Sequence, residues 1–295
     1  MKKTGVILVN WNGFQLTKDC IDSLKEGIVV PNYIVVIDNA SHDNSTALLN
    51  QTFSSDIVII QNTENLGFAE ANNQGIELLL NMGVDYIWLL NNDTLVLPET
   101  LLKLINAYES CDKKEIAAVS AKIYYEGYRD KIWYAGAKRN RFSFGIIHDD
   151  YDITENVKTD FVSGCCIFAS ASIFKEYGGL QKDFIAYSED SEWCLRLNAH
   201  GFKFLVVRDS VIYHKVSASL KKNTGTYNKI SDRALYLMNR NHLWVIRKYA
   251  PHKWFSMFSM LIIGVKNMIF ELPDIKRCKV IIKSYAHGLF KPINF

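Results

Sequence analysis

The sequence predicts an α/β fold in which a parallel sheet is flanked by helices. Strand patterns ending at Val9, Ile37, Ile60 and Leu90 alternate with segments of helical spacing, the order that produces a parallel sheet. The strand that ends at Leu90 is apolar throughout, as expected for a strand buried on both faces. Hydrophobic residues make up 48% of the 295-residue chain, which suffices for a sizeable core.

Helical spacing predicts helices over about residues 14–26, 43–51, 67–80 and 98–108. Pro98 suits the first turn of its helix, where a missing N–H costs nothing. After about residue 112 the alternation lapses, and residues 123–152 are weakly patterned. Further on, we expect strands over 161–168, 202–207 and 210–214, a short helix over 171–177, a helix from the acidic residues 189–192 to Gly201, and a long helix over about 227–249 that Pro251 ends.

The C-terminal end of the chain differs in charge from the rest. From residue 240 onward ten Lys or Arg face two acids, a net charge of +8, whereas the preceding 239 residues carry −5. Residues 254–270 are strongly apolar, but only the twelve residues 254–265 lack a charge, short of the ~20 that span a bilayer. We therefore expect a catalytic domain over residues 1–250 and a basic, amphipathic helical tail over residues 251–295.

The tail is expected to lie on an anionic membrane surface. In this interpretation Trp254, Phe255, Phe258 and Leu261 enter the acyl boundary. The cations expected at the headgroups are Arg247, Lys248, Lys253, Lys276, Arg277, Lys279 and Lys283. The alternative is a helix packed on the catalytic domain or on a second subunit, which would make the tail the contact of a homo-oligomer.

Cysteine usage and missing motifs narrow the class of protein. The six cysteines form no C-x-x-C pair and lie in apolar segments, so we expect buried thiols in a reducing compartment. No apolar signal segment follows Met1, which predicts a cytoplasmic location. The P-loop, dinucleotide-binding, zinc-peptidase and serine-hydrolase motifs are all missing from the sequence, and no nucleic-acid partner is expected.

Polar clusters follow the predicted strands, and the carboxyl ends of parallel strands meet at the edge where ligands bind. Asp38 and Asp93 each follow a strand. An acidic cluster at residues 189–192 and His214 come later. Carboxylates and imidazole suit Mg²⁺ or Mn²⁺, particularly when a diphosphate supplies further oxygens. Taken singly, Asp38 would be a turn residue, the acids a helix cap and His214 a core histidine.

Five segments in the same order resemble the glycosyltransferase family 2 enzymes, notably the rhamnosyltransferase-like branch. They read VILVNWNG at 6–13, VVIDNAS at 35–41, NLGFA at 65–69, LLNND at 89–93 and EDSEWCLR at 189–196. The resemblance covers about residues 4–250. It implies a GT-A fold, a Rossmann-like and mostly parallel sheet flanked by helices, and inverting transfer of a sugar from a nucleotide diphosphate donor.

The resemblance also implies roles for individual residues. Asp190 matches the general base, with Glu189 and Glu192 as competing candidates. Asp93 matches the last position of the family's D-x-D motif, whose first position is Asn91 here, and would bind Mg²⁺ or Mn²⁺ together with His214. The donor pocket would include Asn10, Trp11, Asp38, Asn65, Asn91 and Asn92.

The function that these observations predict is transfer from a dTDP- or UDP-sugar, with dTDP-rhamnose as one candidate. The acceptor would be a hydroxyl of a growing surface polysaccharide or of a lipid-linked oligosaccharide, at the inner face of the cell membrane. One alternative is a sugar-nucleotide nucleotidyltransferase, although residues 10–13 lack the arginine usual in that class. A second is a non-catalytic module that binds a nucleotide or sugar.

Overall fold

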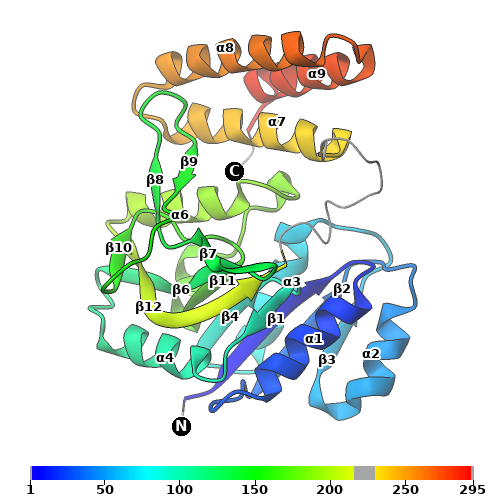
Figure 1. Cartoon of the computed structure of the whole chain (residues 1–295), viewed down its shortest axis with the longest axis vertical. Coiled ribbons are helices and arrows are strands. Elements are labelled where there is room, and N and C mark those ends of the chain that lie inside the picture. Colours follow the sequence, from blue (N-terminus) through cyan, green and yellow to red (C-terminus); the bar gives the residue numbers. More distant parts are fainter. Residues whose placement is uncertain (1, 216–229, 294–295) are drawn as a thin grey trace.

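The N-terminal half of the chain repeats a strand followed by a helix. The computed structural model describes residues 2–215 and 230–293 (Figure 1). The elements of this half are β1 (Thr4–Asn10), α1 (Phe14–Lys25), β2 (Tyr33–Asp38), α2 (Ser45–Phe53), the 3₁₀ turn η1 (Ser54–Asp56), β3 (Val58–Gln61), α3 (Phe68–Asn81) and β4 (Tyr86–Leu90). The strands lie in the order β4-β1-β2-β3 and are parallel, as predicted.

The rest of the sheet is mixed. It contains β5 (Thr94–Val96), β6 (Ile116–Tyr125), β7 (Tyr128–Tyr134), β10 (Val157–Thr159), β11 (Cys166–Ser170) and β12 (Lys203–His214), with α4 (Thr100–Ser110) between β5 and β6. β11 joins the two halves, because it pairs antiparallel with both β4 and β6. β12 is parallel to β6 but antiparallel to β5 and β10. The predicted parallel pairing of strands is therefore found in the N-terminal half and in one further pair, β6 with β12.

Several predicted boundaries need correction in this second half. Strand β6, which lies between β11 and β12, was not predicted. Its alanines have low strand propensity, so the sequence did not indicate a strand here. In the structure all of β6 except its last two residues is buried. The strands expected at 202–207 and 210–214 are one strand with a register shift between Val207 and Val211. The strand expected at 161–168 begins only at Cys166.

The remaining elements carry the chain to the far end of the molecule. They are the hairpin β8 (Ala137–Arg139) and β9 (Ile146–His148), α5 (Ala171–Tyr177), the 3₁₀ turn η2 (Lys182–Phe184), α6 (Glu189–Ala199), α7 (Asp232–Tyr249), α8 (Lys253–Glu271) and α9 (Ile275–Phe290). The helix expected from residue 227 begins at Asp232, where the Ser231 side chain accepts a hydrogen bond from the Ala234 N–H; residues 227–229 lie outside the described part. In Figure 1, α8 and α9 form the top layer above α7, and the β8–β9 hairpin reaches toward them.

The tail packs on α7 through an apolar cluster of its own. Leu243, Ile246 and Ala250 from α7 and its end contact Met260 of α8 and Ile281 of α9. The tail is therefore attached to the body of the protein, as one of the alternatives expected. The outer face of α8 remains exposed: Trp254 is 75% and Phe270 85% exposed. Within the described residues, α8 is the one helix whose length and composition would allow it to cross a membrane.

The expectation of buried thiols is confirmed for four of the six cysteines. All six are free thiols. Four are buried, Cys20, Cys165, Cys166 and Cys194, and the other two are half-buried.

Candidate active site

The loops that follow β1, β2 and β4 are joined by a hydrogen-bond network at the carboxyl edge of the sheet. Asp38 is fully buried, and its carboxylate accepts hydrogen bonds from Asn10 Nδ2 at 2.8 Å and from the Ser41 N–H at 2.9 Å. Asn10 Oδ1 in turn accepts from Thr17 Oγ1 at 2.7 Å, and Thr17 Oγ1 accepts from Asn92 Nδ2 at 2.8 Å. Asn10, Asp38 and Asn92, which were all predicted to bind the donor, thus share one network.

A second network positions Asn65. Asn39, which the sequence analysis did not select, donates from Nδ2 to Asn65 Oδ1 at 3.1 Å and accepts at Oδ1 from the Leu66 N–H at 3.0 Å. Gly67 follows with φ +88°, and a Cβ there would lie 2.5 Å from the carbonyl oxygen of Ile185. Only glycine tolerates this conformation and this close approach. The Asn65 loop therefore packs directly against the segment that leads to Asp190.

Trp11, unlike the buried Asp38, is largely exposed to solvent. It is 55% exposed, at the end of β1. Its indole is thus open to a molecule bound at the sheet edge.

A cavity of about 760 Å³ brings together residues from distant parts of the chain. The predicted site residues Asn91, Glu189, Asp190 and His214 all line it. Three further side chains of its wall were missed by the sequence analysis: Trp133, His148 and His242. They come from the weakly patterned stretch and from α7, and no local motif marks them.

These additional residues give the cavity an aromatic, uncharged wall. The Trp133 ring meets the rings of His214 and His148 edge-on, with centroids 4.8 and 5.1 Å apart. Burial lowers the pKa of His148 and of His242, so both imidazoles are neutral at pH 7. Met260 of α8 also lines the cavity, so the tail contributes to the site. Aromatic walls with a few placed polar groups are typical of sites for small polar ligands.

Asp190 is held as a hydrogen-bond acceptor at the start of α6. Its carboxylate accepts from the Gly164 N–H at 2.9 Å and from its neighbour's N–H, on Ser191, at 2.6 Å. Burial raises the pKa of Asp190, and these two N–H groups oppose the rise by stabilising the ionised form. An ionised carboxylate facing a cavity can accept a proton from a bound hydroxyl.

Glu189 lies beside Asp190 but in a different environment. Burial, and then the charge of Asp190, raises the pKa of Glu189 to about 8. Its Oε2 has no hydrogen-bond partner among residues 2–215 and 230–293. At pH 7 Glu189 is therefore mostly protonated, whereas the rise in the pKa of Asp190 is opposed by two N–H groups. Two neighbouring carboxyls whose environments separate their pKa values can divide the acid and base forms between them.

Glu192 does not share this cavity. It is buried, accepts hydrogen bonds from Arg196 Nη2 at 3.0 Å and from the Tyr249 hydroxyl at 2.6 Å, and so links α6 to α7. We assign Glu192 a structural role, which separates it from the other two acids.

Asp93 and His214 form the expected pair. Asp93 Oδ1 lies 3.1 Å from His214 Nε2, because β5 pairs with the end of β12. Adjacent ligands of an octahedral ion with bonds of ~2.1 Å lie about 3 Å apart, so the spacing fits a divalent cation. The buried Oδ1 of neighbouring Asn91 and Nδ1 of His214 lack hydrogen-bond partners in the described part. No three His, Cys, Asp or Glu side chains in that part form a metal-binding group, so a cation would need further oxygens from a ligand.

Comparison with known proteins identifies the fold and the family. Residues 5–178 match the model of Glycosyl transferase family 2. The chain is 24% identical over 250 residues to the dTDP-rhamnosyl transferase RfbF of Shigella flexneri, covering 81% of this chain and 76% of that protein. It is 23% identical over 215 residues to the O-antigen chain rhamnosyltransferase RfbN of Salmonella typhimurium, covering 72% and 66%.

The structure resembles that of GalNAc-T7 with UDP, GalNAc and Mn²⁺, with a TM-score of 0.64 and 15% identity. The match covers 86% of this chain and 49% of that one, so the chain spans about half the length of that protein. This likeness confirms the GT-A class of α/β fold. The chain therefore belongs to glycosyltransferase family 2 and is a glycosyltransferase, with two rhamnosyltransferases among the proteins it is similar to.

Proposed function

We propose that this protein is an inverting glycosyltransferase of polysaccharide biosynthesis, which moves a sugar from a dTDP- or UDP-linked donor to a hydroxyl of a surface polysaccharide or a lipid-linked oligosaccharide. One observation carries the proposal: a single cavity is lined by Asp190, whose carboxylate accepts two backbone N–H bonds, and by Asn91 and His214, which adjoin the sheet edge with the donor network. The two related rhamnosyltransferases support dTDP-rhamnose as the first donor to test. The alternatives, a nucleotidyltransferase or a non-catalytic module, give no reason for a carboxylate held by two N–H groups in this cavity.

In the proposed reaction, Asp190 accepts the proton of the acceptor hydroxyl. The hydroxyl oxygen forms a bond to the anomeric carbon as the bond from that carbon to the diphosphate breaks, and attack from the opposite face inverts the configuration. No covalent enzyme intermediate is needed. Asn10, Asp38, Asn65 and Asn92 shape the nucleotide pocket, and the exposed indole of Trp11 offers a surface for the base. Holding both reactants in one cavity supplies the positioning that such a displacement requires.

A divalent cation, Mg²⁺ or Mn²⁺, is part of this proposal. Asp93 and His214 would hold it, and when bound it would neutralise the departing diphosphate. The presence of Mn²⁺ in the related GalNAc-T7 structure supports this assignment. Asn91 brings no charge to the site, so Asp93 is the one carboxylate of its motif.

A thermal-shift screen tests the proposed donor. We expect one nucleotide family among UDP-, dTDP- and GDP-sugars, with Mn²⁺ or Mg²⁺, to raise the melting temperature, because a ligand at 100 times its Kd stabilises the folded state by about 2.7 kcal/mol. The same donor should slowly release nucleotide diphosphate when no acceptor is present. If no sugar nucleotide either stabilises the protein or is hydrolysed, the proposed function is wrong.

We further propose that the enzyme binds peripherally to the inner face of the cell membrane through the outer face of α8, with residues 251–295 as the membrane-facing region. This face carries large exposed apolar residues along the helix: Trp254, Phe255, Phe258, Leu261, Ile262, Val265, Ile269 and Phe270. Exposed lysines surround it, at positions 253, 266, 276, 279 and 283. An apolar face with basic flanks matches the surface of an anionic bilayer.

Both arginines expected at the membrane have other partners, and Lys276, although exposed, lies 3.4 Å from Asp232. Arg277 is buried and pairs with Glu271 at 3.2 Å and with Asp232 at 3.3 Å. Arg247 donates to the carbonyl oxygens of Gly288 and Lys291. Both therefore stabilise the helical layer and do not face headgroups. Because α9 packs beside α8 and carries exposed lysines, surface binding also fits better than a crossing of the membrane.

Replacing Trp254, Phe258 and Phe270 together by serine should abolish co-flotation with vesicles containing phosphatidylglycerol. These side chains are exposed, so the melting temperature should change little. The matched control replaces Ile28 and Tyr128, exposed on other elements, and should float like the wild type. If the triple variant floats as the wild type does, the membrane proposal is refuted. If the wild type is a dimer and the triple variant is a monomer, this face binds a second copy of the chain instead. Truncation at Tyr249 is a poor test, because it would uncover the apolar cluster on α7.

A further inference from the structure

The segment that leads into the Asp190 helix has an unusual backbone. Ile185 has φ +66°, and Tyr187 and Ser188 both have φ +68°. None of these is glycine, and Ile185 is β-branched, so each stands in the left-handed region against its own preference. Such conformations persist only where the surroundings hold them, and they concentrate at functional sites. Ser188 directly precedes Glu189, so the path of residues 183–188 sets where Asp190 lies.

One side chain of α7 holds much of this segment. Asn241 is fully buried, and its Nδ2 lies 2.9 Å from the carbonyl oxygen of Phe184, 2.8 Å from that of Ala186 and 2.7 Å from that of Tyr187. The Phe184 carbonyl, at the end of η2, also accepts from the Ala186 N–H at 2.7 Å and from Arg240 Nη2 at 3.3 Å, whereas those of Ala186 and Tyr187 lie beyond η2 and before α6. Buried carbonyls of this kind need such partners, because leaving them unpaired is costly.

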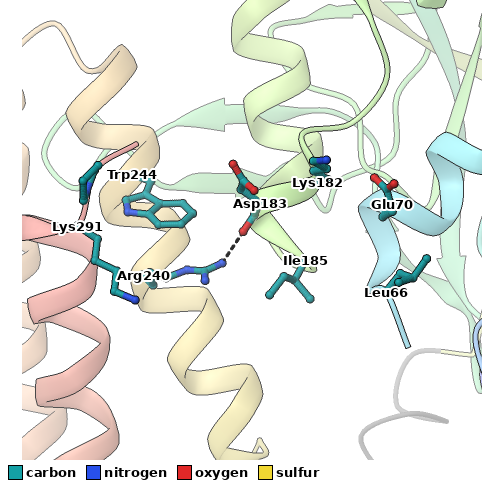
Figure 2. A pocket seen from close by; sticks show the side chains of 9 residues that line it. Leu66, Glu70, Lys182, Asp183, Ile185, Arg240, Trp244 and Lys291 are labelled. Atoms are coloured by element: carbon teal, nitrogen blue, oxygen red, sulfur yellow. Dashed lines mark hydrogen bonds between the residues drawn. The ribbon is translucent and has the colours of Figure 1, made fainter. Parts of the chain in front are cut away.

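The neighbouring Arg240 completes the contact and orients Asn241. Its Nη2 donates to the carbonyl oxygen of Asp183 at 2.8 Å, as Figure 2 shows. Its Nε donates to Asn241 Oδ1 at 2.8 Å, which directs the Asn241 N–H groups toward the segment. The guanidinium lies over the Trp244 ring, 4.2 Å from its centroid, so its own position is fixed by packing.

We propose that Arg240 and Asn241 are positioning residues for the general base. The pair holds residues 183–188 in the conformation, with positive φ at Ile185, Tyr187 and Ser188, that presents Asp190 to the cavity and to the N–H groups of Gly164 and Ser191. The inference rests on the proposed role of Asp190. Neither residue touches the reacting atoms. The role that α7 has in catalysis is to position Asp190. The carbonyl of Ile185, which Asn241 does not reach, accepts from the Ala69 N–H of α3 at 3.2 Å, so the segment is held from both sides.

The isosteric change Asn241→Asp tests this, because it replaces the two N–H donors by an oxygen facing three carbonyls. We expect kcat to fall by about 10²-fold, the effect of a small misplacement of a reacting group. Loss of the N–H bonds to Asp190 should also raise its pKa, which moves the acid limb of the kcat profile to higher pH. Stabilisation by UDP or dTDP with Mn²⁺ should fall much less than kcat, because Asn10, Asp38 and Asn92 lie on other elements and Asn65 is held by Asn39.

Asn198→Asp is the matched control, since Asn198 Nδ2 donates to the carbonyl oxygen of Asp160 at 3.0 Å away from the cavity. It should lower the melting temperature without moving the pH profile. If Asn241→Asp does not fold, Arg240→Lys is measured instead. It should also lower kcat and move the acid limb of the kcat profile to higher pH. Wild-type kcat and pH profile in the folded variant would overturn the positioning role, whereas a wild-type protein inactive on every sugar nucleotide would refute the proposed function instead.

Discussion

Replacing Asp190 by asparagine is expected to lower kcat by about 10²- to 10⁴-fold, the usual contribution of a general base. The variant keeps the shape of the side chain but cannot accept the proton of the acceptor hydroxyl. Donor binding should persist, because the loops after β1, β2 and β4 form the donor network without Asp190. The measurement is release of nucleotide diphosphate at saturating donor and acceptor, with donor binding followed by thermal shift.

Glu189→Gln is the control that separates the two acids. The pKa of Glu189 is raised to about 8, so at pH 7 the side chain is mostly protonated and glutamine is its uncharged equivalent. We expect near wild-type kcat at pH 7 for this variant. Burial raises the pKa of Asp190 as well, so the wild-type kcat should fall with decreasing pH through a limb above the ordinary aspartate range near 4. If Glu189→Gln lowers kcat at pH 7 as much as Asp190→Asn does, the assignment of the general base to Asp190 is wrong.

Local signals explain why so much of the donor edge could be predicted from sequence. Asp38 ends β2 and Asp93 follows β4, and the rule that ligands bind at the carboxyl edge then places both at that edge. The pairing of Asp93 with His214 is different, because it depends on β5 lying against the end of β12, far along the chain. Only the family resemblance connected these two residues before the structure did.

Burial and pairing account for what the sequence did not reveal. Arg277 reads as one more cation of a basic tail, but its burial beside Glu271 follows from how α8 and α9 pack. Trp133 lies on β7, whose first residues are all exposed and show no alternation, and His148 lies on β9, which has only 3 residues. Glu192 stands in the same acidic motif as Asp190, yet its place on α6 points it to Arg196 and away from the cavity. Contacts distant in sequence complete two of these roles: Arg277 also pairs with Asp232, and Glu192 also accepts a hydrogen bond from the Tyr249 hydroxyl.

Replacing Asp93 by alanine is expected to lower kcat by about 10²- to 10³-fold, the range for removing one group that stabilises developing charge. Stabilisation by the donor in the presence of Mn²⁺ should also decrease, and direct titration with Mn²⁺ should show weaker binding. Asp19→Ala is the matched control. It removes the 2.8 Å ion pair with Lys215, next to His214, but no predicted metal ligand, and should leave Mn²⁺ binding intact.

A chelator distinguishes the cation from the carboxylate itself. In EDTA the wild type should lose activity by a similar factor and recover when Mn²⁺ is added, whereas Asp93→Ala should respond to neither. The requirement follows from the charge of the site: the leaving diphosphate is strongly anionic, Asn91 is neutral, and Asp93 supplies the one carboxylate beside His214. A wild type fully active in EDTA would make the Asp93–His214 pair structural and leave the diphosphate to be neutralised by N–H groups and cationic side chains alone.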